Sequence, residues 1–89
     1  MRNFQVKEDK IREDTIEKCG NVYKYSLTDR SDFKSRLYKF EIEMKMSKRT
    51  SLASSTVSLT REKAIVLYEK LVKNLATPID LAFIIEDEA

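Results

Sequence analysis

Apolar and charged residues alternate almost without interruption over residues 37–46, and this alternation is the strongest structural signal in the chain. Side chains two positions apart on a β-strand lie on the same face, so the pattern predicts a strand with one buried and one solvated face. We expect this strand to lie at the centre of the fold. Its buried face would carry Tyr38, Phe40, Ile42, Met44 and Met46, and its solvated face Lys39, Glu41, Glu43 and Lys45.

Residues 21–28 alternate in the same way and predict a second strand with its aromatic residues on one face. The segment between the two strands is polar and rich in residues that favour turns, so we expect the strands to run antiparallel. Cross-strand charge favours a register in which Tyr25 lies opposite Phe40, because Lys24 then faces Glu41 and not a lysine.

Residues 51–58 predict a weaker third strand, joined to the second by a four-residue loop over 47–50. With Ser51 beside Met46, the small side chains of this strand lie on the apolar face and Leu52 points outward. A strand of small Ser, Thr and Ala side chains at a sheet edge leaves backbone donors and acceptors open, either to solvent or to another chain.

Two helices are expected after the strands. Thr60 is a suitable N-cap for a helix over 61–75, in which apolar positions recur with the helical period. Pro78 then disfavours helical backbone at Thr77 and starts a second helix with Asp80 at its third position. Both helices should cover the apolar face of the sheet. The stripe of the first helix comprises Ala64, Ile65, Tyr68, Leu71, Val72 and Leu75.

The first twenty residues show neither a helical nor a strand period for long, so we predict a flexible N-terminal arm over 1–20. A short helix over 8–18 is one alternative, and a strand through Phe4 and Val6 is another. The apolar residues of this segment are Phe4, Val6, Ile11 and Ile16.

A chain of 89 residues has room for one hydrophobic core. The sequence therefore predicts a single α+β domain over residues 21–89. Its architecture would be a three-stranded antiparallel β-meander packed on one face by two consecutive C-terminal α-helices.

Composition argues against enzyme chemistry. The chain has no histidine, one cysteine and one glycine, which excludes histidine-based catalytic triads, structural zinc sites of the usual kind and glycine-rich phosphate loops. Glu41 and Glu43 would be a candidate carboxylate pair, but they alternate with lysines and should form ion pairs across the strands. We therefore expect no catalytic residue, no metal site and no cofactor.

The same composition predicts a cytoplasmic protein that does not enter a membrane. The chain has no apolar run of 18 residues, and its amino terminus lacks the apolar stretch of a secretory signal. Cys19 is the single cysteine, so no disulfide can form within the chain.

The second helix is more apolar than a surface helix requires. Leu81, Ala82 and Ile85 already supply a core stripe, so Ile79, Phe83 and Ile84 cannot all face inward. Surplus apolar surface of this kind indicates an interface. We therefore predict a non-enzymatic interaction or accessory module. Its contact with a protein partner or with a second copy of the chain would use Leu52, Ile79, Phe83 and Ile84.

Weak nucleic-acid binding is the alternative function. Residues 21–50 hold eight basic and four acidic residues, whereas residues 79–89 hold four acidic residues and no basic one. Aromatic residues flanked by lysines can stack on bases, but alternation places these rings on the face that the helices cover. Contact with phosphates would instead use a basic patch at the hairpin tip, comprising Lys34, Lys45, Lys48 and Arg49.

The final third of the chain combines the Thr77-Pro78 corner, Leu81 and an acidic Glu86-Asp87 ending. This pattern resembles a family of small bacterial domains of unknown function, found mainly in Gram-positive anaerobes. In that family a tyrosine-containing strand leads into a meander, a helix, a Ser/Thr-Pro-x-x-Leu corner and a short helix with an acidic end. The resemblance supports the predicted fold and implies no known activity, substrate or cofactor.

Overall fold

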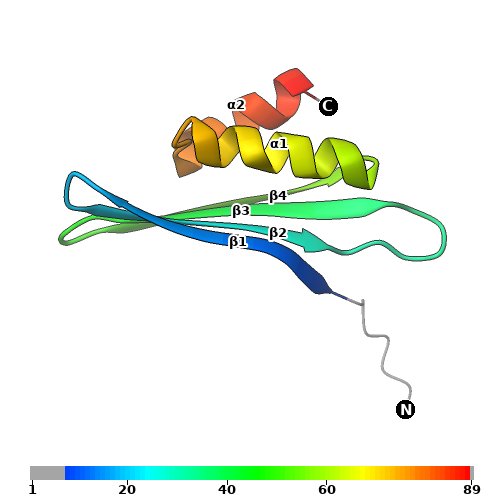
Figure 1. Ribbon diagram of the computed structural model, residues 1–89, viewed down its shortest axis with the longest axis horizontal. Coiled ribbons are helices and arrows are strands. Elements are labelled where there is room, and N and C mark those ends of the chain that lie inside the picture. The colour runs from blue at the N-terminus through cyan, green and yellow to red at the C-terminus, as the bar shows by residue number, and fades with distance from the viewer. Residues whose placement is uncertain (1–7, 89) are drawn as a thin grey trace, which may run out of the picture.

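The computed structural model describes residues 8–88, which form an antiparallel sheet of four strands with two helices on one of its faces (Figure 1). Each strand pairs with the next in the chain, so the sheet is a simple meander in the order β1-β2-β3-β4. The predicted α+β meander with two C-terminal helices is confirmed, but it has four strands and not three. The elements are β1 (Asp9–Lys18), β2 (Asn21–Asp29), β3 (Leu37–Lys45), β4 (Thr50–Ser58), α1 (Arg61–Lys73) and α2 (Pro78–Glu88).

The additional strand is β1, which occupies residues 9–18 of the segment predicted to be a flexible arm. The prediction of an arm is therefore wrong for these residues, and so is the alternative of a helix over residues 8–18. β1 pairs with β2 along its whole length, with a register shift between Lys10 and Arg12 that marks a β-bulge. Ile11 and Ile16 both pack against the core, although an odd spacing would place them on opposite faces of a regular strand. The bulge inserts one residue and so corrects the spacing. The alternative strand through Phe4 and Val6 lies outside the described residues.

A two-residue turn joins β1 to β2. Lys18 pairs with Asn21, and the residues between them have positive φ, 54° at Cys19 and 82° at Gly20. Two consecutive residues with positive φ are typical of the type I′ turn, whose twist matches that of a hairpin. The chain's single glycine therefore occupies a position where the backbone requires it.

The register of the central strands differs from the prediction by two residues, which leaves every face unchanged. Tyr25 pairs with Ile42 and not with Phe40, and Lys24 pairs with Glu43. Ser51 likewise pairs with Met44 and not with Met46. A shift of two preserves the hydrophobic pattern, so alternation alone cannot distinguish these registers, and the turns decide between them. At the β3–β4 turn, the Met46 and Arg49 backbones bond to each other, so the loop is two residues shorter than expected.

The helices cover the face predicted to be apolar. α1 packs on β2 and β3, and α2 packs on β4 and β3. Thr60 caps α1 as predicted, accepting a hydrogen bond of 3.2 Å from the Lys63 backbone N–H. Leu67 was missed as a core residue, while Ile65 and Val72 are only partly buried. The buried side chains are Tyr23, Tyr25, Leu27, Tyr38, Phe40, Ile42, Ala64, Leu67, Tyr68, Leu71, Ala76, Leu81 and Ile85.

In the part of the chain from residue 8 to 88, neither helix has the length and apolarity needed to cross a membrane.

Candidate functional site

Two buried tyrosines connect the helical layer to the sheet. The Tyr25 hydroxyl on β2 donates a 2.8 Å hydrogen bond to the Ala76 carbonyl, in the corner between the helices. The Tyr68 hydroxyl on α1 lies 2.6 Å from an Asp14 carboxylate oxygen on β1 and 3.2 Å from the Tyr25 carbonyl. Burial raises the pKa of Tyr25 to about 12, with Tyr23 and Asp80 adding to the effect. Burial, and then Asp14, also raises the pKa of Tyr68. These hydroxyls are therefore neutral groups that serve the fold.

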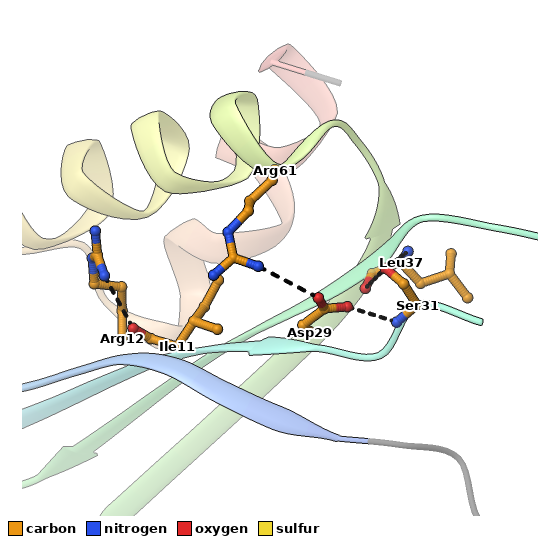
Figure 2. Close-up of polar contacts among 6 residues, drawn as sticks. All are labelled: Ile11, Arg12, Asp29, Ser31, Leu37 and Arg61. Carbon is orange, nitrogen blue, oxygen red and sulfur yellow. Dashed lines mark hydrogen bonds and ion pairs between the residues drawn. The ribbon is translucent and has the colours of Figure 1, made fainter. Parts of the chain in front are cut away.

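A second polar cluster fixes the β2–β3 connection to the first turn of α1 (Figure 2). The Ser31 backbone N–H donates a 2.8 Å hydrogen bond to Asp29, and the Leu37 N–H donates one of 3.0 Å to the Ser31 hydroxyl. The Arg61 guanidinium lies 3.8 Å from the other Asp29 oxygen. Hydrogen bonding by Ser31 lowers the pKa of Asp29, and Arg61 contributes to the shift. The spacing of Asp29 and Ser31 is typical of an Asx-turn, a signal that the sequence analysis did not use.

The residues predicted to contact a partner lie on β4 and α2. The side chains of Ile79 and Phe83 on α2 are 77% and 69% exposed, and Leu52 on β4 is 62% exposed. Ile84 differs from these three exposed residues, because its side chain packs against the core and is partly buried. Since α2 packs on β4, both elements belong to the same side of the molecule. We call the surface that comprises β4 and the exposed residues of α2 the β4–α2 side.

The residues predicted to contact nucleic acid are divided between the two ends of the sheet. Lys48 and Arg49 lie in the β3–β4 turn, next to Lys45 at the end of β3. Lys34 lies in the β2–β3 connection, at the opposite end (Figure 1). A nine-residue strand separates the two loops by roughly 30 Å. The predicted patch is therefore reduced to three residues.

Lys34 instead belongs to a basic cleft near the start of α1. The cleft has a volume of about 560 Å³ and also contains Arg36 from the β2–β3 connection and Lys63 from α1. Ser35, Ser58, Leu59 and Thr60 complete its lining. This cleft cannot be predicted from local sequence, because Arg36 and Lys63 come together only through the tertiary fold.

Other chemically capable groups are dispersed. Within residues 8–88, no three His, Cys, Asp or Glu side chains gather closely enough to hold a metal ion. The Glu41 carboxylate lies 3.8 Å from the Lys39 ammonium of the same strand, whereas an ion pair across the strands was expected. The residues opposite Glu41 on the neighbouring strands are Ser26 and Ser54. Cys19 is exposed in the β1–β2 turn. A groove of about 330 Å³ runs beside α1 and is lined by Leu59, Val66 and Leu67 together with the charged residues Glu62, Lys63 and Lys70.

The two edges of the described sheet differ in character. β1 has seven charged residues among its ten and carries the bulge. β4 has no charged residue in nine, and its pairing with β3 shows no shift of register. Charge and bulges are the usual means by which an edge strand avoids pairing with another chain, so β1 is protected and β4 is not.

These features define a small α+β protein in which a four-stranded meander carries two helices on one face. The chain belongs to DUF6514, a family of unknown function whose model matches residues 4–88. The matched region includes β1 as well as the elements predicted from sequence. A search of the curated proteins and a search of the solved structures each found no match.

Proposed function

We propose that this protein is a non-enzymatic interaction module that binds another protein chain through its β4–α2 side. The supporting observation is the exposure of Ile79 and Phe83, one helical turn apart on α2. Large apolar side chains that stay exposed next to an open sheet edge are typical of protein-binding surfaces. Leu52 extends this surface onto the helix-free face of the sheet.

The use of the polar groups also favours a binding role over catalysis. The pKa values raised by burial belong to Tyr25 and Tyr68, and both hydroxyls bond to groups of the fold itself. Asp29, whose pKa is lowered, is likewise used to fix a loop to α1. A perturbed pKa supports a catalytic role when the group also faces a cleft that could hold a substrate. We therefore include no cofactor in the proposal.

Site-specific photocrosslinking in the source organism tests this function. A photoreactive residue would replace Phe83 or Leu52, with Thr15 as the matched control because it is also exposed on an edge strand. We expect protein adducts from the first two positions and none from Thr15. Equal labelling at all three positions, or no adduct at Phe83 and Leu52, would contradict the proposal.

Binding of single-stranded nucleic acid is the second candidate, supported by the convergence of Lys34, Arg36 and Lys63 on one cleft. Fluorescence anisotropy with a labelled oligonucleotide at about 50 mM salt provides the test. Replacing the three cleft residues by Ser should abolish binding, whereas replacing Lys45, Lys48 and Arg49 should not. If the unaltered protein gives no change in anisotropy at micromolar concentration, this candidate is rejected.

We further infer, from the sequence resemblance and the single cysteine, that the protein works in the bacterial cytoplasm. Cys19 offers a direct test because its side chain is exposed. A thiol reagent that cannot cross membranes should label Cys19 in lysed cells and leave it unlabelled in intact cells. Labelling of intact cells would place the protein outside the cytoplasm.

A further inference from the structure

The edge strand β4 is built for regular pairing along its whole length. All nine residues pair with β3 in one uninterrupted register, which leaves the opposite line of backbone N–H and C=O groups facing outward within the described part of the chain. Its side chains are Ser, Thr, Ala, Val and Leu, with no lysine, proline or bulge to prevent another strand from pairing.

We propose that the occupant of this edge is β4 of a second copy of the chain. The two strands would run antiparallel about a twofold axis, and the two four-stranded sheets would join into one sheet of eight strands. The inference rests on the proposed function, since it names the partner of the β4–α2 side. A twofold axis is the commonest symmetry of protein dimers and makes each copy contribute the same surface.

The composition of β4 suits pairing with itself. With the axis at Ser54, the two Ser54 residues lie opposite each other and Ala53 lies opposite Ser55. Further along the pair, Leu52 lies opposite Thr56. Every cross-strand pair is therefore uncharged, so the symmetric arrangement brings no like charges together. The antiparallel direction, which a twofold axis imposes, also preserves the alternation of the two faces.

The position of α2 gives the second argument for a copy of this chain. A twofold axis perpendicular to the sheet keeps both helical layers on the same face. Because α2 is the helix that packs on β4, the two α2 helices would become neighbours across the axis. Ile79 and Phe83, both exposed in the single chain, are then available to bury apolar surface between these helices. The dimer would thus be held together both by backbone pairing of the two β4 strands and by apolar contact between the two α2 helices.

Analytical ultracentrifugation of the full chain tests this arrangement. We expect a reversible dimer between about 10 μM and about 1 mM protein. Ser54→Lys places two ammonium groups opposite each other at the axis and should give a monomer, and Ser54→Glu should do the same with two carboxylates. An equimolar mixture of the two variants should restore a dimer, because Lys then faces Glu.

Thr15→Lys is the matched control, since it adds the same charge to the exposed face of the other edge strand and should remain dimeric. Ser54 is exposed, so circular dichroism should show both Ser54 variants folded as before. A monomer at 1 mM, a dimer that persists in Ser54→Lys, or a mixture that stays monomeric would each overturn the inference. The proposed function would survive that result if Phe83 or Leu52 still crosslinked to a different protein, and would fail if neither position formed an adduct.

Discussion

At the scale of single residues, the side chains that connect the two layers are tyrosines whose rings lie in the core and whose hydroxyls reach oxygen atoms on distant elements. Alternation along the strand predicted the inward face of Tyr25, and the helical period predicted that of Tyr68. Neither pattern predicts a hydrogen-bond partner more than forty positions away, such as Asp14 or Ala76. The polar contacts of the core follow from the tertiary arrangement and not from local sequence.

The contact between Tyr68 and Asp14 should be measurable as a coupling energy. Tyr68→Phe removes a hydrogen bond to a carboxylate and should lower the free energy of unfolding by about 1–2 kcal/mol. Asp14→Asn should cost less, because Asp14 is exposed. A double-mutant cycle by urea unfolding should give a coupling of about 1 kcal/mol. Tyr23→Phe is the control, because no hydrogen bond of its hydroxyl is found within residues 8–88. Additive effects of the first two substitutions would contradict the contact.

Tyr25 should make the protein less stable at alkaline pH. Its pKa is about 12 in the folded chain against 10.0 ordinarily, so the neutral hydroxyl is favoured by folding. This contribution is fully present below pH 10 and is lost as the pH rises toward 12. Urea unfolding across this pH range should show a steeper fall in stability for the unaltered protein than for Tyr25→Phe. The two proteins differ only in the Tyr25 hydroxyl, so identical slopes would count against its burial.

At the scale of secondary-structure elements, the corner between α1 and α2 lies where the sequence predicts it, and the Asp80 side chain supplies hydrogen bonds there. The Asp80 carboxylate accepts hydrogen bonds from both the backbone N–H and the hydroxyl of Thr77, at 3.0 and 2.9 Å. The carboxylate at the third position therefore caps the start of α2 and also lies favourably at the positive end of the helix dipole.

This arrangement predicts an order of effects. Asp80→Ala removes both hydrogen bonds and should lower the free energy of unfolding by about 1.5 kcal/mol. Thr77→Ala removes one of them and should cost about 0.5–1 kcal/mol. The double variant should be little worse than Asp80→Ala alone, because the two residues share one network. Thermal unfolding of the three proteins checks the order, and a larger effect of Thr77→Ala than of Asp80→Ala would show that Thr77 is the main cap.

β1 marks the limit of prediction from periodicity. The strands from residue 21 onward alternate regularly, because one face of each meets the helices and the other meets solvent. β1 has few apolar residues, and its bulge changes the spacing between the two that pack inward, so its pattern matched no regular element. Gly20 was the local signal available, since glycine readily adopts the positive φ that a type I′ hairpin turn requires. A β-hairpin could be predicted here only if this turn signal is given more importance than the irregular hydrophobic pattern that precedes it.

At the scale of the whole molecule, the two edges of the described sheet differ in charge, and the exposed apolar residues lie near the uncharged edge. The charged strand β1 forms one edge of the described sheet, and the uncharged strand β4 forms the other. The exposed apolar residues predicted from sequence, Leu52, Ile79 and Phe83, all belong to the elements on the β4 side. Each of these residues could be predicted from sequence, whereas their common location depends on α2 packing on β4. The candidate surface could therefore be recognised only from the fold, although its individual residues could be predicted from the sequence.

Removal of β1 tests whether the domain requires all four strands. The shortened chain corresponds to the three-stranded domain predicted over residues 21–89. Without β1 the chain loses the partial burial of Ile11 and Ile16 and the hydrogen bond between Tyr68 and Asp14. These losses amount to at least about 3 kcal/mol, a large part of the stability of a domain this size. The melting temperature should therefore fall by at least about 12 °C relative to a control chain that begins at Glu8 and retains every described element. Calorimetry on the two chains measures this difference. Equal melting temperatures would mean that residues 21–89 form a complete domain to which β1 adds no stability.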